Sequence, residues 1–261
     1  MLLNFSKNYM TSQNKKYIIA NWKMKLGQQA AVELAKKIKK QYRGGGSVEL
    51  VVCPSATALS AVAEIFKGTE IKLGVQDIFY HDFGAYTGQI SPSVVKEIGC
   101  EYAIIGHSEV RKLGETDENV NRKVAVALKH NLTPIICVGE TFQEYEAKKT
   151  EVVIINQVVK ALEDVKLEAG QKVIIAYEPV WVIGSGQAVD HGIFQQIVQI
   201  IAHTAIEMGE KLSNKFEVIY GGSVDEDNIK DFIAGNISTG VIVGNNSLVA
   251  DKLLKIIRNI Q

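Results

Sequence analysis

The feature that most constrains the fold is a regular alternation between short, β-branched apolar runs and longer amphipathic stretches. Eight runs have the composition of parallel strands buried on both faces of a sheet: Tyr17–Ala20, Val48–Cys53, Ile71–Gln76, Tyr102–Gly106, Pro134–Val138, Val173–Tyr177, Val218–Tyr220 and Val241–Val243. Helical patterns follow nearly every run, at Gln28–Tyr42, Thr116–Lys129, Gln143–Val165, Phe194–Met208, Asp227–Ala234 and Leu248–Ile260. Such alternation predicts βαβ units and a parallel sheet.

The number of units decides between two α/β architectures. Eight units within about 245 residues favour a closed (β/α)8 barrel over an open, doubly wound sheet. No internal stretch rich in Pro, Gly or Ser divides them, so we expect a single domain over residues 17–261. Residues 1–16 are mostly polar and lack the apolar stretch of a signal peptide, which predicts a loose N-terminal extension.

Composition excludes several classes of protein. The 29 Lys and Arg residues balance 29 Asp and Glu residues, and this zero net charge argues against nucleic acid or a membrane surface as partner. The three cysteines are far apart and the five histidines are scattered, so neither a disulfide framework nor a metal site is expected. No apolar run approaches the roughly 18 residues of a membrane-spanning helix. Together these features favour a reducing, cytoplasmic location.

Polar and glycine residues follow five of the predicted strands. In a barrel, catalytic groups gather where the carboxyl ends of the strands meet the following loops. The segments at these ends are Asn21-Trp22-Lys23, Gly106-His107-Ser108-Glu109, Glu178-Pro179, Gly221-Gly222-Ser223 and Gly244-Asn245-Asn246. The two glycine turns follow neighbouring strands and indicate a phosphate site built from backbone N–H groups, although ordinary tight turns would have the same composition.

Glu178 stands between a strand and an apolar loop. A carboxylate walled by Trp181 and Ile183 would be desolvated, and its pKa would rise towards that of a useful base; the alternative is a salt-bridge partner. The loop has a rigid start, an apolar tip and glycines at its end, which is typical of a hinged lid, the alternative being an ordinary packed loop. The predicted lid consists of Pro179, Val180, Trp181, Val182, Ile183, Gly184, Ser185 and Gly186.

Two further groups share this end of the barrel. His107 follows a buried run, where a histidine is often only a core residue, but its place at a helix-like start favours a neutral imidazole. Lys23 would be ordinary solvated surface in isolation. Beside a phosphate turn it becomes the counter-charge for the ligand.

Seven segments resemble the triosephosphate isomerase family, in family order and spacing from about Tyr17 to the C-terminus. They are Asn21-Trp22-Lys23-Met24, Gly84-Ala85-Tyr86-Thr87-Gly88, Ile105-Gly106-His107-Ser108-Glu109, Cys137-Val138-Gly139-Glu140, Ala176-Tyr177-Glu178-Pro179-Val180-Trp181, Ile183-Gly184 and Tyr220-Gly221-Gly222-Ser223-Val224. The first and fifth segments are specific even alone. The resemblance implies a single-domain TIM barrel that interconverts dihydroxyacetone phosphate and D-glyceraldehyde 3-phosphate through an enediolate, without metal or organic cofactor.

The resemblance also implies a role for each site residue. Glu178 would move a proton between C1 and C2, while neutral His107 would polarise the carbonyl group. Lys23 would offset phosphate and oxyanion charge, Asn21 would hydrogen-bond the oxyanion, and Glu109 would orient the region around Lys23 and His107. The phosphate would be held by backbone N–H groups of Gly184, Ser223, Gly244 and Asn245.

A homodimer is a further implication. The loop Gln76–Gly88 matches the interlocking loop of the family, in which Thr87 would insert beside Lys23 of a second subunit. The alternative is a loop that packs on its own barrel, and the aromatic residues Phe83 and Tyr86 argue against it.

The chain departs from the family pattern at four places. Val110 and Gln89 replace an arginine and a glutamate that pair in the family, so both charges are lost together and no buried charge is stranded. The loop after Glu109 is one residue shorter. Gln187-Ala188-Val189 replaces the usual end of the lid, and Asn245 replaces a glycine on the phosphate side.

These departures leave one related activity open, an isomerase of a four-carbon ketose phosphate of the erythrulose phosphate type. Asn245, Val182 and the shortened loop would be compatible with its modified pocket. A Schiff-base aldolase would need a lysine where Glu178 stands, and a metal-dependent aldolase would need clustered histidines. A non-catalytic barrel would have to retain an unused catalytic set.

Overall fold

The structure, a computed structural model, describes residues 15–44, 46–182, 188–209, 215–233 and 238–261. Residues 1–14 of the predicted N-terminal extension lie outside the described residues. The lid residues Ile183, Gly184, Ser185 and Gly186 also lie outside them, as does Gln187 at the end of the lid.

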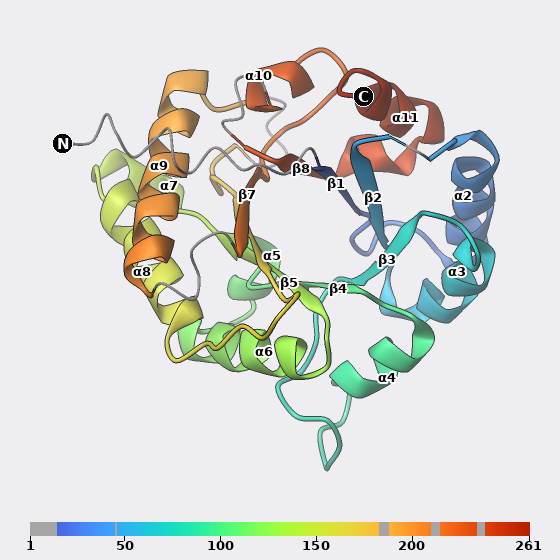
Figure 1. Ribbon diagram of the computed structural model, residues 1–261, viewed down its shortest axis with the longest axis horizontal. Helices are drawn as coiled ribbons and strands as arrows, with labels where there is room; N and C mark the ends of the chain where they lie inside the picture. Colours follow the sequence, from blue (N-terminus) through green and yellow to red (C-terminus); the bar gives the residue numbers. More distant parts are fainter. Residues whose placement is uncertain (1–14, 45, 183–187, 210–214, 234–237) are drawn as a thin grey trace.

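Within the described residues, eight parallel strands close into a barrel (Figure 1). They are β1 (Lys16–Asn21), β2 (Val48–Cys53), β3 (Lys72–Val75), β4 (Tyr102–Ile105), β5 (Thr133–Val138), β6 (Val173–Tyr177), β7 (Phe216–Tyr220) and β8 (Gly240–Val243). Each strand pairs with the next along the chain, and β8 pairs with β1 through the register Ile18 to Val241. The predicted closed barrel is confirmed, and each strand lies within two residues of its predicted bounds.

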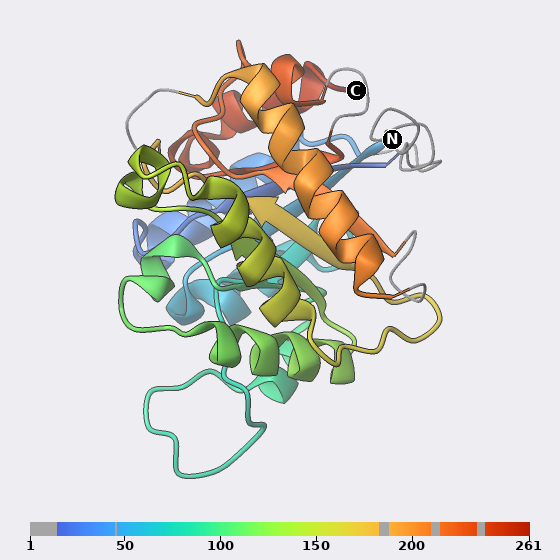
Figure 2. The same ribbon diagram turned by 90° about the vertical axis from the view of Figure 1, so that its left-hand side faces the viewer.

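Helices surround the strands on the outside of the barrel (Figures 1 and 2). They are α2 (Gln28–Gln41), α3 (Leu59–Phe66), α4 (Pro92–Ile98), α5 (Ser108–Arg111), α6 (Asp117–Lys129), α7 (Phe142–Glu146), α8 (Thr150–Leu162), α9 (His191–Glu207), α10 (Ile229–Ile233) and α11 (Ala250–Arg258), with 3-10 turns at Ala56–Ala58 and Asn245–Leu248. Among the described residues, no helix is long and apolar enough to cross a membrane.

The prediction of one helix over Gln143–Val165 is wrong, because the chain forms two helices there. A capping box between Thr141 and Glu144 starts α7, which ends at Glu146. Lys148 then adopts a left-handed conformation with φ of 56°, which a continuous α-helix does not accommodate. The second helix, α8, therefore begins afresh at Thr150.

The two faces of the barrel wall enclose separate cores, which explains the continuous apolar runs. One set of side chains fills the barrel interior, and it includes Ile19, Ile104 and Ile174. The alternate set packs outward against the helices, where it meets buried positions such as Val120 and Val124 of α6. Because both faces of each strand are buried, the sequence shows no polar alternation.

Charged and phenolic groups close the amino-terminal end of the barrel. Tyr102 donates a hydrogen bond to Glu49, and Lys172 donates one to Tyr17. Glu217 is 3% exposed, and burial raises the pKa of its carboxyl group. This end is opposite the loops that carry the predicted site.

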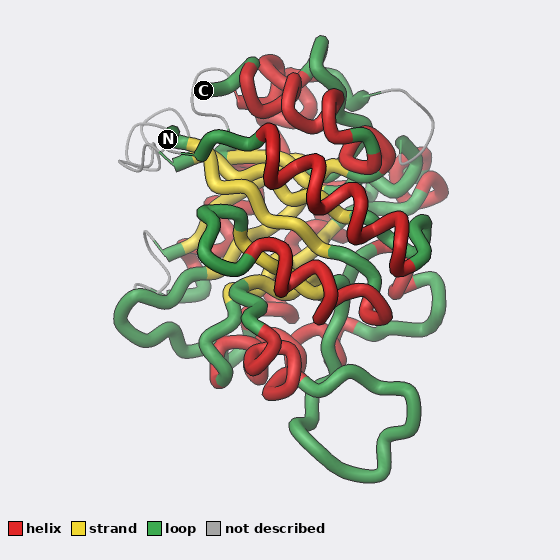
Figure 3. Tube along the Cα trace, turned by 90° about the vertical axis from the view of Figure 1, so that its right-hand side faces the viewer, coloured by secondary structure: helices red, strands yellow, loops and turns green. Residues whose placement is uncertain are grey.

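A loop between β3 and α4 projects from the barrel (Figures 2 and 3). At its base, buried Lys123 of α6 contacts Asp77 at 2.8 Å and Glu115 at 2.5 Å. Further out, the Tyr86 ring stacks on His81 with centroids 4.9 Å apart. Phe83 is 73% exposed, so the loop presents an aromatic side chain to its surroundings.

Candidate active site

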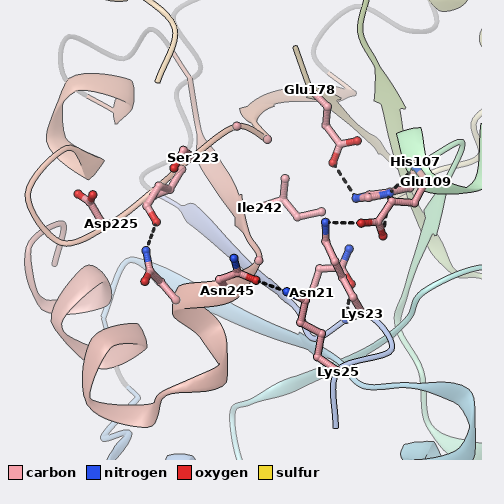
Figure 4. Close-up of a pocket in the computed structure, with 15 residues that line it drawn as sticks. Asn21, Lys23, Lys25, His107, Glu109, Glu178, Ser223, Asp225, Ile242 and Asn245 are labelled. Atoms are coloured by element: carbon pink, nitrogen blue, oxygen red, sulfur yellow. Dashed lines mark hydrogen bonds and ion pairs between the residues drawn. The ribbon is translucent and has the colours of Figure 1, made fainter. Parts of the chain in front are cut away.

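A pocket of about 460 Å³ lies at the carboxyl end of the strands (Figure 4). It brings together the ends of β1, β4, β6, β7 and β8, which the sequence predicted to share one end of the barrel. Its lining residues are Asn21, Lys23, Lys25, His107, Glu109, Glu178, Gly221, Gly222, Ser223, Val224, Asp225, Ile242, Gly244, Asn245 and Asn246. Each predicted catalytic or phosphate-binding residue that the structure describes lines this pocket. The lid residues Pro179 to Val182 and the dimer-loop residues Tyr86 and Thr87 do not line it.

Glu178 and His107 lie side by side in the pocket, and their side chains contact each other (Figure 4). Glu178 follows β6 directly and is 2% exposed, and its Oε1 lies 3.4 Å from His107 Nε2. The backbone N–H of Ser108 donates to Glu178 Oε2 at 3.4 Å. His107 Nδ1 accepts the backbone N–H of Glu109 at 3.1 Å, so Nδ1 carries a lone pair. The proton of a neutral ring is therefore on Nε2, directed towards Glu178 and the pocket.

Two glycines allow Glu178 to occupy this place. A Cβ atom at Gly139 would lie 1.8 Å from the Glu178 carbonyl oxygen, and one at Gly221 would lie 2.5 Å from Glu178 Cγ. Neither position tolerates a side chain unless Glu178 moves. Sequence reasoning assigned no such role to Gly139, although it lies in one of the family-like segments.

Lys23 is held in an unusual backbone conformation at the end of β1. Its φ is 51°, and its N–H donates to Asn21 Oδ1 at 3.1 Å. Gln76, directly after β3, donates its amide N–H groups to the carbonyl oxygens of Lys23 and Cys53, at 2.9 Å and 3.0 Å. Sequence reasoning missed Gln76, because only the closed barrel brings its side chain to Lys23.

The ammonium group of Lys23 pairs with Glu109. Lys23 Nζ lies 2.8 Å from Glu109 Oε1. Partial burial alone would raise the pKa of the Glu109 carboxyl group, but the hydrogen bond and charge of Lys23 outweigh it and lower that pKa below its ordinary value. Glu109 is therefore ionised at neutral pH and fixes the position of the Lys23 side chain.

The first residues of the predicted lid are anchored on buried Glu140. Glu140 Oε1 accepts hydrogen bonds from Trp181 Nε1 at 2.8 Å and from the Tyr177 hydroxyl at 3.2 Å. The Trp181 ring also stacks on Tyr145, with centroids 4.3 Å apart. Burial raises the pKa of Glu140. Trp181 does not line the pocket, so the expectation that it walls Glu178 gains no support.

The opposite side of the pocket is built from the turns after β7 and β8. Ser247 donates its N–H and hydroxyl groups to the Gly244 carbonyl oxygen, at 2.9 Å and 2.6 Å. Asn246 donates its side-chain amide to the Val224 carbonyl oxygen at 2.7 Å, which joins the two turns. Ser223, Gly244 and Asn245 thus line one wall. Of the predicted phosphate-binding set, only Gly184 lies outside the described residues.

Arg111 braces the loop after His107, where the chain departs from the family pattern. Its Nε donates to the Gly106 carbonyl oxygen at 2.8 Å, and its Nη1 lies 2.6 Å from Asp117 Oδ1. Its Nη2 also reaches the Cys137 carbonyl oxygen at 3.4 Å. One arginine therefore links β4, β5 and α6 beneath the pocket.

Comparisons with known proteins agree with this geometry. A family model described as triosephosphate isomerase matches residues 16–260. The triosephosphate isomerases of Thermoanaerobacter sp. (strain X514) and Dictyoglomus turgidum are 41% and 40% identical, covering 92% and 94% of this chain and 97% and 99% of their own. The crystal structure of triosephosphate isomerase from Bartonella henselae superposes with a TM-score of 0.81 at 32% identity, covering 94% of this chain and 98% of its own.

Proposed function

The chain belongs to the triosephosphate isomerase family and is an aldose–ketose isomerase, and we propose that Glu178, His107 and Lys23 carry out its reaction. The reaction interconverts dihydroxyacetone phosphate and D-glyceraldehyde 3-phosphate. The observation that carries the residue assignment is the 3.4 Å contact between Glu178 and His107, in a pocket that Lys23 also lines. A carboxylate, an imidazole and an ammonium group thus surround one space of the size of a small ligand.

Glu178 removes the proton from one carbon of the substrate and returns it to the neighbouring carbon. Glu178 is 2% exposed and lines the pocket, so its carboxylate reaches a bound substrate from a fixed position. His107, protonated on Nε2, donates to the carbonyl oxygen and exchanges protons between the two oxygens of the enediolate. The Nε2 proton is available because Nδ1 is occupied by the Glu109 N–H.

Lys23 and Asn21 stabilise the negative charge that develops on the substrate oxygen. Preorganised donors of this kind are each typically worth about 3 kcal/mol of the barrier. Glu109 positions Lys23 through their 2.8 Å pair. Backbone N–H groups at Ser223, Gly244 and Asn245 hold the phosphate, and the family pattern adds Gly184. Residues 179–186 form the lid that excludes water; the anchoring of Trp181 on Glu140 supports a fixed start for that lid.

A conservative substitution at the base tests the assignment. Glu178→Gln keeps the size of the side chain and removes its basicity, so proton exchange between the substrate carbon and solvent should cease. Binding of glycerol 3-phosphate, which has the phosphate but no carbonyl group, should change by less than about twofold. Glu97→Gln, at an exposed position of α4, is the matched control. Proton exchange at the wild-type rate in Glu178→Gln would show that another group is the base.

No finding favours the four-carbon alternative. The relatives named above are triosephosphate isomerases, and Asn245 and Val182 lie in a barrel that superposes on one. Assays of the purified protein on D-glyceraldehyde 3-phosphate and on a four-carbon ketose phosphate, under identical conditions, compare the two substrates directly. We expect turnover with the three-carbon substrate to be faster.

We further propose that the protein is a homodimer joined by the loop between β3 and α4. Phe83 is 73% exposed and Met24, beside Lys23, is 94% exposed, so each offers apolar surface to a second subunit. Thr87 of one subunit would lie beside Lys23 of the other. Thr87→Glu should place a charge in this contact and yield weakly active monomers in size-exclusion chromatography. A fully active monomer would contradict the proposal.

The start of the family match supports the proposed domain boundaries, and the cysteines support the proposed cytoplasmic location. The family match begins at residue 16, where β1 also begins, which supports a domain over residues 17–261. The loose extension over residues 1–16 stays a prediction. All three cysteines are free and buried, and free thiols are typical of a reducing compartment such as the cytoplasm.

A further inference from the structure

We propose that Lys25 binds the substrate phosphate and that the side chain of Asn245 holds it in position to do so. This assignment assumes the isomerase function proposed above. It adds a charged side chain to a phosphate site otherwise made of backbone N–H groups and Lys23. Nothing in the sequence singled out Lys25, which the structure places at an exposed position in the loop after β1.

The geometry places Lys25 in the pocket. Lys25 Nζ donates a 2.8 Å hydrogen bond to Asn245 Oδ1, which joins the loop after β1 to the turn after β8. Both residues line the same pocket as Ser223 and Gly244. Figure 4 shows Asn245 between Ser223 and the Lys25 side chain. The ammonium group therefore lies next to the backbone that would receive the phosphate.

The charges around the pocket make a second ammonium group significant. Three carboxylates line the pocket, and they belong to Glu109, Glu178 and Asp225, whereas the lysines that line it are Lys23 and Lys25. Lys23 is already paired with Glu109. A phosphate monoester brings between one and two further negative charges at neutral pH. Without Lys25, this ligand would face two carboxylates that no lysine of the pocket offsets.

Lys25 is suited to this task because its charge is not already neutralised. In the part of the chain that the structure describes, no carboxylate lies within ion-pair distance of Lys25. Its partner is the neutral amide oxygen of Asn245, which fixes the ammonium group without cancelling its charge. Asp225, the remaining acidic residue of this wall, accepts the backbone N–H groups of Asp227 and Asn228 with its Oδ1.

Asn245 also accounts for one departure from the family pattern. A glycine at this position offers only its backbone N–H to a phosphate, whereas asparagine keeps that N–H and adds a side-chain acceptor. The Asn245 side chain is exposed and directs its oxygen to Lys25. The pair Lys25–Asn245 is thus a single unit, with the lysine as ligand and the asparagine as support.

Glycerol 3-phosphate is the probe, because it carries the phosphate and cannot be isomerised. Calorimetric titration of Lys25→Met should give a dissociation constant about tenfold higher than wild type, as expected for loss of one charge-assisted hydrogen bond at an open site. Lys25→Arg should restore most of the affinity, and Asn245→Ala should weaken binding about threefold, since the ammonium group remains but is no longer fixed. Lys37→Met, at an exposed position of α2, removes the same charge away from the pocket and should bind like wild type.

Two readouts separate phosphate binding from a purely structural latch. In Lys25→Met, KM should rise by the same factor as the dissociation constant while kcat stays within about twofold, and the dependence of kcat/KM on ionic strength should weaken. Lys25→Met binding the probe as tightly as Lys37→Met would overturn the proposal. So would an equal loss of melting temperature in Lys25→Met and Asn245→Ala with unchanged affinity.

The outcomes for the two proposals are distinct. If the wild type isomerises the substrate but Lys25→Met binds glycerol 3-phosphate as tightly as wild type, the role of Lys25 is refuted and the isomerase function stands. If Lys25→Met binds glycerol 3-phosphate more weakly but the wild type shows no isomerisation, the isomerase function is refuted and the contact of Lys25 with phosphate stands. No binding of the probe by the wild type would refute the phosphate site itself.

Discussion

Gly221→Ala tests how closely the rate depends on the position of Glu178. The new Cβ atom would lie 2.5 Å from Glu178 Cγ, 2.8 Å from Ile242 Cγ2 and 3.2 Å from Glu178 Oε1. Ordinary contact requires at least 3.4 Å, so the Glu178 side chain must retreat by about 1 Å. The 3.4 Å contact with His107 Nε2 cannot survive such a shift unchanged.

The expected effect on turnover is large. A misplacement of about 1 Å at a reacting group can cost about 100-fold in rate, which corresponds to about 2.7 kcal/mol of barrier. The donors assigned to the phosphate lie on Ser223, Gly244 and Asn245, so the dissociation constant of glycerol 3-phosphate should change by less than about threefold. The substitution therefore lowers kcat and leaves binding of the phosphate nearly intact.

The measurement needs a control for stability. Overpacking typically costs about 1–3 kcal/mol of unfolding free energy, so the melting temperature of Gly221→Ala should also fall. Ile38→Val, in the buried face of α2, should cost about 1 kcal/mol and leave kcat unchanged. Coupled-assay kinetics in both directions, below the melting temperature of each variant, give the comparison. Turnover of Gly221→Ala within threefold of wild type would refute the idea that Glu178 is held to a narrow position.

Two further predictions concern stability. Lys123→Met leaves Asp77 and Glu115 without their shared buried cation, so the unfolding free energy in urea should fall by about 3 kcal/mol, and a loss below 1 kcal/mol would contradict this. Burial raises the folded-state pKa of Glu217 above its ordinary value of 4.5, so the native state binds more protons than the unfolded state above that pH and its stability falls as pH rises. Urea unfolding from pH 4.5 to 7.5 should show that the unfolding free energy of Glu217→Gln rises relative to that of wild type as pH rises. A difference between the two free energies that stays constant or narrows would refute burial of Glu217 as the cause.

Much of the fold was predictable because each strand is buried on both faces and forms a continuous apolar run. The site was predictable for a related reason, since the carboxyl ends of parallel strands must meet at one end of a barrel. The break between α7 and α8 was missed because a lysine, Lys148, adopts the left-handed conformation that glycine normally marks. Gln76 and Lys25 were missed because their partners lie 53 and 220 positions away, and only the closed barrel brings them together.

The double hydrogen bond from Gln76 restricts which residues can occupy that position. Its amide nitrogen faces two carbonyl oxygens, those of Lys23 and Cys53. A carboxylate there would set oxygen against oxygen, and an apolar side chain would leave the Lys23 carbonyl oxygen without its donor, whereas the Cys53 carbonyl oxygen would still accept the Trp22 N–H at 3.1 Å. Substitution is therefore limited to side chains that present two N–H groups, even though Gln76 does not line the pocket. A redesign of the loop that begins at Asp77 should therefore keep the Gln76 amide. Its hydrogen bond to the Lys23 carbonyl oxygen fixes the backbone that positions the Lys23 ammonium group.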